Sequence, residues 1–229
     1  MYRYETHLHT WPVSRCAKSD VRETLEFYKH MGYAGIFLTN HYLDGNINID
    51  HTLPLDARLN FYFSDYYAAL DIAEEVGIQV FMGIEMSYKG TDFLVYGLDD
   101  VWYFAHPELD RMRKSQQLPY LMEHGALIIH AHPFREASYI DHIRLYPRQV
   151  HGVEIYNANR TDFENHMAEV YAREYGLLPF AGSDNHWAGN AAKLGGMCFN
   201  TPLVDERDFA ARILRGEGEL FRIDMEDRK

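Results

Sequence analysis

Two pairs of residues near opposite ends of the chain carry side chains that can bind metal ions. His7 and His9 are separated by one residue, and Asp184 and His186 are spaced in the same way. In a strand, alternate side chains point to the same face, so each pair would present two ligand groups together. Imidazoles and carboxylates are common zinc ligands. The two pairs therefore indicate a metal centre, provided that the fold brings them together.

Four apolar runs inside the chain are each followed by residues of the same kind. Residues 34–38 precede His41, 78–82 precede Glu85, 126–129 precede His132, and 177–181 precede Asp184 and His186. Continuous apolar runs of this length are typical of parallel strands that are covered on both faces. Because parallel strands end at the same edge of a sheet, that edge would gather the metal-binding candidates.

Helical spacing separates the apolar runs. Val21, Leu25, Tyr28 and Met31 form one such pattern, and Tyr66, Leu70, Ala73 and Val76 form another. Two further helices are expected to end before Gly125 and Gly176, since glycine commonly closes a helix. Repeated strand and helix units with reactive groups past the strand ends predict an α/β barrel with its active site at the C-terminal face.

Three segments fall outside this alternation. Residues 44–60 are polar and predict a loop over the barrel mouth, with aromatic residues 61–63 that either stack on a base or pack in the core. Residues 94–97 predict an extra strand after the turn-forming residues 88–92. The charged end beyond Leu220 predicts fraying at residues 227–229.

Composition limits the classes of function. The 229 residues, 47% of them hydrophobic, suit a single domain over residues 1–229. A net charge of -12 argues against long nucleic acid and anionic membranes as partners. With only two cysteines, no signal region and no run near about 20 apolar residues, we expect a soluble cytoplasmic protein.

Five motifs, in this order, resemble those of the PHP (polymerase and histidinol phosphatase) superfamily. They are His7-Leu8-His9-Thr10, Thr39-Asn40-His41, Gly83-Ile84-Glu85, Ala131-His132-Pro133 and Gly182-Ser183-Asp184-Asn185-His186. The resemblance extends from residue 5 to about residue 187. It implies a distorted (β/α)7 TIM-like barrel of the PHP type. It also implies a centre of two or three divalent ions, zinc, manganese or iron, that hydrolyses phosphoesters.

Carried over to this chain, the resemblance implies seven metal ligands with Glu85 as the bridge. They are His7, His9, His41, Glu85, His132, Asp184 and His186. The chain departs from the family pattern in two places. Cys16 stands near the position where many trinuclear members have another histidine, so it is either a thiolate ligand or a small packed residue. Asn40 replaces a common aspartate, which would lower the negative charge of the site.

Other histidines and two arginines are weaker candidates. His106 and His124 lie between Glu85 and His132, where a trinuclear member needs one more histidine, although loop structure and a helix end explain them as well. His130 shares strand parity with His132, but core packing explains it better. Arg135 stands where family members often bind substrate phosphate, and Arg160 is a second candidate.

The expected reaction is attack of a metal-activated water on a phosphoester. In this hypothesis Glu85 bridges the ions, Arg135 stabilises the phosphoryl charge, and His186 or His41 supplies a proton to the leaving group. Candidate substrates are small phosphomonoesters, such as histidinol phosphate or a nucleotide phosphate, and short phosphodiesters. An amidohydrolase and a metal-binding module without turnover remain alternatives, and the sequence leaves the oligomeric state open.

Overall fold

Ten strands form two mixed sheets within residues 1–226, the part of the chain that the computed structural model describes. The fraying expected at residues 227–229 lies outside this range. The first sheet has the order β10-β9-β1-β2-β3. Its strands are β1 (Tyr2–Glu5), β2 (Gly35–Leu38), β3 (Gln79–Met82), β9 (Lys193–Phe199) and β10 (Glu219–Asp224). β1, β2 and β3 are parallel, and β9 is antiparallel to β1 and β10.

The second sheet has the order β4-β5-β6-β7-β8. Its strands are β4 (Ile84–Tyr88), β5 (Thr91–Tyr96), β6 (Leu127–Ala131), β7 (Gly152–Asn157) and β8 (Leu178–Gly182). β6, β7 and β8 are parallel, so they end at one edge, whereas β5 is antiparallel to both of its neighbours. Each sheet therefore contains three parallel strands that can deliver side chains to a common edge.

The two sheets meet on two sides. On one side, only Gly83 separates β3 from β4, and His41 forms a parallel bridge to Glu85. On the other side, Leu8, which follows β1, forms a parallel bridge to Asn185, which follows β8. Both meeting points lie just past strand ends, which is where the candidate ligands were expected.

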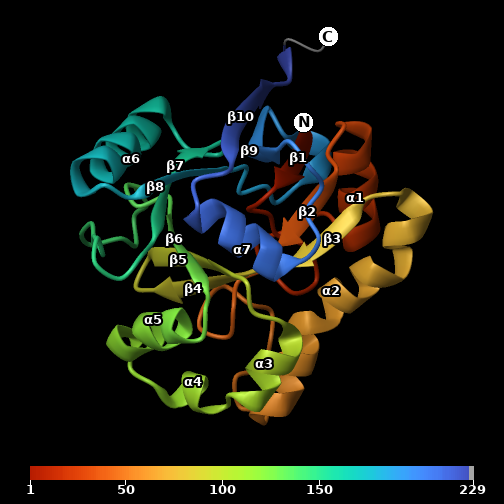
Figure 1. Cartoon of the computed structure of the whole chain (residues 1–229). Coiled ribbons are helices and arrows are strands. Elements are labelled where there is room, and N and C mark those ends of the chain that lie inside the picture. Colours follow the sequence, from red (N-terminus) through yellow and green to blue (C-terminus); the bar gives the residue numbers. More distant parts are fainter. Residues whose placement is uncertain (227–229) are drawn as a thin grey trace.

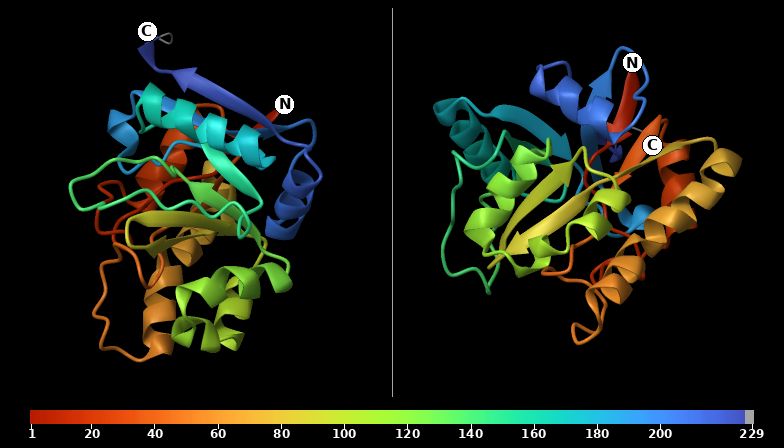
Figure 2. Two further views of the ribbon diagram at one scale, coloured as in Figure 1. Left: turned by 90° about the vertical axis from the view of Figure 1, so that its left-hand side faces the viewer. Right: turned by 60° about the horizontal axis from the view of Figure 1, so that its bottom comes forward.

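Helices cover the outer faces of the sheets. They are α1 (Val21–His30), α2 (Leu55–Val76), α3 (Asp100–Ala105), α4 (Glu108–Arg111), α5 (Lys114–Glu123), α6 (Asp162–Tyr175) and α7 (Glu206–Leu214), with a 3-10 turn at Ala188–Asn190. Figure 1 shows α1 and α2 beside the first sheet, and α6 beside β7 and β8. α3, α4 and α5 gather at the end of the molecule opposite β10, as the left view of Figure 2 shows. None of the helices in residues 1–226 combines the length and the apolar character needed to cross a membrane.

Local sequence signals account for several helix ends. The Asp20 side chain accepts the Glu23 N–H at 2.9 Å and caps α1. Thr161 and Glu164 form a capping box at the start of α6, and Gly176 ends that helix with a φ of 66°. Gly125 follows α5 with a φ of 88°. The two helices predicted to end at glycine are thus confirmed.

One side chain of α7 contacts both sheets. The ring centroid of Phe209 lies 4.2 Å from that of Phe37 in β2 and 5.1 Å from that of Tyr96 in β5. All three side chains are buried. The two sheets therefore contribute to a shared hydrophobic cluster that packs beneath α7.

The loop predicted over residues 44–60 is too long. α2 begins at Leu55, because Leu59, Tyr62 and Phe63 recur at helical spacing and are buried. Pro54 directly precedes the helix, where its missing N–H breaks no helical hydrogen bond. Tyr62 and Phe63 pack in the core, so the idea that this aromatic group stacks on a substrate base is wrong.

The sheets are parallel only in part, as the strands outside the predicted apolar runs show. The extra strand expected at residues 94–97 exists as β5, but it pairs antiparallel with β4 and β6. The turn before it is confined to Lys89 and Gly90, which have φ values of 51° and 80° and allow a tight reversal. β9 and β10 form a second antiparallel addition, and neither strand was predicted.

Candidate metal centre

His7 and His9 lie beyond the end of β1 and not within a strand as predicted. β1 ends at Glu5, whose Oε1 atom accepts the backbone N–H groups of Thr6 and His7, each at 2.9 Å. These bonds take the place of strand pairing and turn the chain toward the centre of the molecule. The two imidazole rings still face one region, with centroids 5.4 Å apart.

Asp184 and His186 follow β8 and lie against the first pair. The backbone N–H of Asp184 donates to the His7 carbonyl at 2.7 Å. Asp184 has a φ of 53°, which is uncommon for a residue other than glycine. The end of β8 can approach this closely because Gly182 has no side chain, and a Cβ there would lie 2.5 Å from the His7 Cβ. Residues from opposite ends of the sequence thus lie side by side.

Glu85 lies between the other candidate ligands. Its Oε2 atom is 2.6 Å from Nδ1 of His41, which follows β2. Its Oε1 atom is 3.2 Å from Nε2 of His132, which follows β6 with a φ of 27°, and 3.3 Å from Nε2 of His7. Glu85 is the second residue of β4 and does not follow β3 as a loop residue. This position suits a carboxylate that is shared between ions.

Buried polar atoms at this centre have no well-aligned hydrogen bond within residues 1–226, although Nδ1 of His41 and Oε2 of Glu85 are in ion-pair contact. These buried atoms are Nε2 of His7, Nε2 of His9, Nδ1 of His41 and Oε2 of Glu85. Buried atoms of this kind are costly unless something binds them. Ligand atoms of three sets of residues lie within 4.8 Å of one another: His7, His9 and Asp184; His7, Glu85 and His132; and His9, His41 and His186. Nitrogen and carboxylate oxygen donors in such groups fit divalent transition metal ions.

The charges of the carboxylates suit the same purpose. Burial raises the pKa of Glu85, but the imidazoles of His41, His132 and His7 outweigh it and hold that pKa well below its usual range. Burial also raises the pKa of Asp184, but the imidazoles of His7 and His9 outweigh this effect and hold the pKa well below its usual range. Both groups are therefore ionised at neutral pH and ready to bind a cation.

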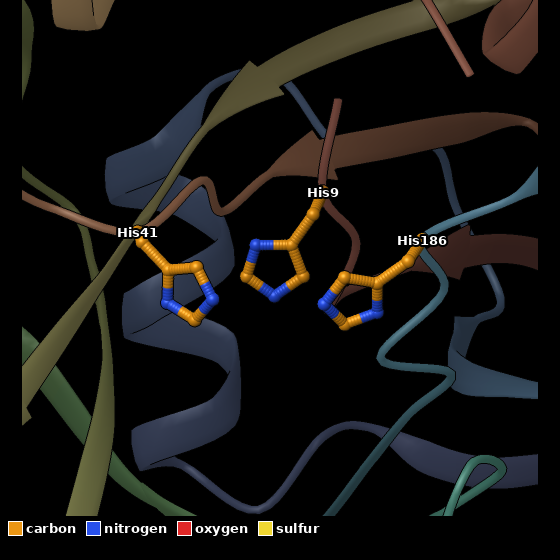
Figure 3. Close-up of side chains that lie close together, drawn as sticks. All are labelled: His9, His41 and His186. Atoms are coloured by element: carbon orange, nitrogen blue, oxygen red, sulfur yellow. The ribbon is translucent and has the colours of Figure 1, made fainter. Parts of the chain in front are cut away.

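Three of the imidazoles form a row at the mouth of the site. Figure 3 shows His9 between His41 and His186, with the three rings converging from different segments. The centroid of the His9 ring is 4.4 Å from each of the other two. Burial, together with the nearby His186 and His41, lowers the pKa of His9 well below its usual value. A neutral His9 has a lone pair available for a metal ion.

Cys16 lies beside this row of histidines. Burial raises the pKa of its thiol, but hydrogen bonds with His186 and His41 outweigh burial and bring it down to about 6. The side chain is partly exposed and lines the cavity above the centre. This place in the cavity lining agrees with the thiolate-ligand alternative, which stays a prediction.

Glu154 in β7 supports two of the candidate ligands from behind. Its Oε1 atom is 2.8 Å from Nδ1 of His7, and its Oε2 atom accepts the backbone N–H of His132 at 3.0 Å. Asn157 donates to the same Oε2 atom at 2.9 Å. A carboxylate that accepts a hydrogen bond from one imidazole nitrogen orients the ring, so that the other nitrogen can bind a metal ion. Glu154 was not among the residues predicted for the site.

Asn40 faces away from the carboxylates of the centre. Its Oδ1 atom accepts the Ser14 hydroxyl at 2.8 Å, and its Nδ2 atom donates to Asp65 of α2 at 3.2 Å. Ser14 in turn lies 3.1 Å from Nδ1 of His9. Asn40 therefore positions His9 through Ser14, and buried Asp65 holds the Asn40 amide in place.

Arg135 lies in a loop after β6 and lines a cavity of about 530 Å³ above the centre. Its Nη2 atom is 2.9 Å from Oδ2 of Asp92, a buried residue of β5. That Oδ2 atom is 3.9 Å from Nε2 of His132, so Asp92 joins the cavity to the metal-binding residues. Arg160 and Lys89 line the same cavity. Asp92 was not predicted as a site residue, because residues 88–92 were expected to form a turn.

Three other histidines do not reach the centre. His106 stacks on Trp102 with centroids 4.2 Å apart, and its ring lies 5.0 Å from that of His124, beside α5. His130 is buried against Phe93 with centroids 5.1 Å apart. Although His130 and His132 are two residues apart, β6 ends at Ala131, so only His132 turns to the centre.

Solved structures with similar folds add a comparison to this geometry. No family model matches the sequence, and no curated protein matches it. A two-domain protein from Bacteroides vulgatus that contains a predicted PHP-like metal-dependent phosphoesterase is 14% identical, with a TM-score of 0.70. The match covers 96% of this chain and 64% of that one, so the chain spans less than two thirds of that protein. This chain has the PHP-like fold.

Two further structures cover nearly all of both chains. An inferred metal-dependent phosphoesterase from Bifidobacterium adolescentis is 13% identical, with a TM-score of 0.54 and 99% of each chain covered. An amidohydrolase from Chromobacterium violaceum, solved with sulfate and without metal, is 14% identical, with a TM-score of 0.51. That match covers 98% of this chain and 99% of that one. Structures named for two kinds of hydrolysis thus share the PHP-like fold.

Proposed function

We propose that this chain is a PHP superfamily enzyme that hydrolyses a phosphoester of a small molecule at a centre of two or three divalent ions. One observation carries the proposal. Buried ligand atoms without hydrogen bonds converge from both sheets directly below a cavity that contains arginines. The net charge of -12 favours a small phosphorylated substrate over long nucleic acid.

We assign the seven candidate ligands to this centre. His7, His9 and Asp184 would hold one ion, and Glu85 with His132 a second, with Glu85 shared between them. His41 and His186 would hold a third ion if Cys16 supplies a thiolate beside them. Zinc, manganese and iron all accept these donors.

The residues of the chain have distinct roles in the proposed reaction. When bound, divalent ions supply Lewis acidity and lower the pKa of a coordinated water to about 7. Arg135 binds nonbridging phosphate oxygens with its guanidinium, which Asp92 holds over the cavity. If only two ions bind and His186 is not a ligand, His186 can pass a proton to the leaving group, since its side chain retains 24% exposure and lines the cavity. His41, on the other side of His9, is the alternative donor.

We also infer that the two sheets form a distorted (β/α)7 barrel of one domain. The bridges at His41 and Glu85 and at Leu8 and Asn185 support this, as does the Thr6 hydroxyl, which donates to the Ala181 carbonyl across the second junction. A closed arrangement would place every parallel strand end around one mouth.

Amide hydrolysis is the second candidate function, favoured by the structural similarity to a protein named as an amidohydrolase. A metal-binding module without turnover is the third. The experiment that separates them begins with the metal content of the purified protein, measured by mass spectrometry for zinc, manganese and iron. Release of 4-nitrophenol from 4-nitrophenyl phosphate and of 4-nitroaniline from an acyl anilide is then followed with each metal.

We expect phosphatase activity that chelator abolishes and added metal restores, and no anilide hydrolysis. The Asp184→Asn variant should lose bound metal, while His106→Gln, which changes a histidine outside the centre, should keep it. Protein that binds none of the three metals near pH 8 would overturn the proposal. Anilide hydrolysis alone would favour the second function, and tight metal binding with no turnover would favour the third.

A further inference from the structure

Glu164 lies in the first turn of α6 and uses both of its carboxylate oxygens. Its Oε2 atom accepts the backbone N–H and the hydroxyl of Thr161, each at 2.8 Å, and so completes the capping box of the helix. Its Oε1 atom accepts the backbone N–H of Glu136 at 2.9 Å, and Glu136 belongs to the loop between β6 and β7. One buried side chain therefore joins the start of α6 to a separate loop.

The two segments that Glu164 joins each carry an arginine of the cavity. Arg135 directly precedes Glu136, and Arg160 directly precedes Thr161. Both arginines line the cavity of about 530 Å³ above the metal centre. The Nε atom of each is buried and has no hydrogen bond within residues 1–226. Each guanidinium therefore retains a donor for a bound anion, provided that its loop is held in place.

Contacts with α6 hold the chain on both sides of Arg135. On one side, the ring centroid of Phe134 lies 6.2 Å from that of Tyr171, and Phe134 packs against a buried cluster on α6 and β7. On the other side, Glu136 donates to Glu164. The loop between β6 and β7, all of which the structure describes, contains no helix or strand. Side-chain contacts of this kind therefore fix its backbone in place of strand pairing.

The charge of Glu164 suits this double contact. Partial burial raises its pKa, but the N–H groups of Glu136 and Thr161 outweigh burial and hold the pKa below its usual value. An ionised carboxylate has two acceptor oxygens, whereas an amide has one acceptor oxygen and one NH2 donor. A glutamine at this position could cap α6 or accept the Glu136 N–H, but it could not do both. The two connections therefore require a carboxylate.

We propose that Glu164 is a positioning residue of the substrate site, which holds the loops of Arg135 and Arg160 in a fixed arrangement above the metal centre. Glu164 does not line the cavity, so it acts only through the two arginines. The inference rests on the proposed phosphoesterase function. It goes beyond that function by giving one side chain of α6 control over both guanidinium groups.

The test uses Glu164→Gln, which removes one acceptor oxygen at nearly constant size. Whichever N–H group then loses its acceptor, one of the two arginine loops is released. We expect kcat/KM for 4-nitrophenyl phosphate to fall about tenfold, because small displacements of binding groups have effects of this order. The affinity of the metal-loaded protein for inorganic phosphate, measured by calorimetry, should fall to a similar extent. The affinity for the metal ion should stay within about twofold, since Glu154 holds the backbone of His132 separately.

Coupling between residues separates positioning from a general structural defect. The effects on kcat/KM of Glu164→Gln and Arg135→Gln, or of Glu164→Gln and Arg160→Gln, should be less than additive by about fivefold. Glu23→Gln, which removes the same charge from the first turn of α1, is the matched control and should leave kcat/KM and phosphate affinity unchanged. Effects that add fully with both arginine variants would overturn the inference.

Amide hydrogen exchange, followed by NMR, provides a readout without turnover. In Glu164→Gln the amide of Glu136 or of Thr161 should exchange faster, while the rest of α6 keeps its protection. Lost protection throughout α6, a lost metal ion, or a variant as active as the parent would overturn the inference and leave the phosphoesterase intact. A parent protein that neither hydrolyses 4-nitrophenyl phosphate nor binds inorganic phosphate would overturn the proposed function and this inference together.

Discussion

Oε1 of Glu154 lies 2.8 Å from Nδ1 of His7, and both side chains have no exposure to solvent. The pair fixes the His7 ring so that its other nitrogen faces Glu85 and Asp184. In the Glu154→Gln variant the carboxylate that orients this ring is lost, and we expect the affinity for a divalent metal ion to fall by about 10- to 100-fold. Competition with a chromogenic chelator measures this affinity. Glu169→Gln, on the exposed face of α6, is the control, and an equal affinity in both variants would remove Glu154 from this role.

Cys16 and Cys198 should differ in reactivity. At pH 7 a thiol with a pKa of about 6 is mostly thiolate, whereas burial raises the pKa of Cys198. Metal-free protein treated with iodoacetamide should therefore be alkylated at Cys16 at least about tenfold faster, as followed by peptide mass spectrometry. Zinc should slow the reaction at Cys16 if the thiolate binds an ion. Equal rates at the two cysteines would contradict the lowered pKa.

Arg135 is expected to affect turnover more than metal binding. A guanidinium that contacts phosphate oxygens contributes about 1.5–3 kcal/mol, so Arg135→Gln should lower kcat/KM about 10- to 100-fold on a phosphomonoester. Arg135→Lys should recover part of this loss, since it keeps the charge but not the paired donors. Steady-state kinetics with metal analysis checks both, with Arg148→Gln as a control at an exposed position. A variant that loses its metal along with its activity would point to a structural role.

His130 should make the protein less stable in acid. Burial, aided by the charge of His132, lowers the pKa of His130 to about 3. The unfolded chain, with a histidine pKa near 6.5, binds a proton that the folded chain does not, so the free energy of unfolding falls as the pH decreases from about 6.5 towards 3. Between pH 7 and pH 5 this one residue costs about 2 kcal/mol of stability.

Urea unfolding of the parent and of His130→Phe at the two pH values checks this value. The difference between the two proteins should shift by about 2 kcal/mol in favour of the variant at pH 5, whatever their difference at pH 7. His166→Phe, at an exposed position on α6, is the control. A constant difference between parent and His130→Phe would show that folding does not lower the pKa of His130.

The sequence predicted much of the site because its key residues follow apolar runs. His41 follows β2 of the first sheet, whereas His132 and Asp184 follow β6 and β8 of the second, so each lies past the end of a parallel strand. Glu85 was found through its motif, although it lies inside β4. The order of residues along parallel strands therefore identified these groups, while the junctions between the two sheets bring them together.

Asp92, which supports the site, could not be predicted from the sequence because antiparallel strand pairing determines its position. Asp92 lies beside His132 only because its partner in the register of β5 and β6 is Ala131. No local periodicity indicates which residues two strands will pair. For the same reason, β9 and β10 were not predicted. The loop predicted at residues 44–60 was six residues too long, because tertiary packing of Leu59 and Tyr62 determines where α2 begins.

The placement of the candidate ligands on both sheets has a consequence for how the molecule opens. His7, His9 and His41 follow strands of the first sheet, whereas Glu85, His132 and Asp184 belong to the second or follow its strands. An ion held by both sets acts as a reversible cross-link between two halves of the molecule. Without it, amide hydrogen exchange should reveal separate opening of the two sheets, and with it their slowest amides should exchange together as one cooperative unit.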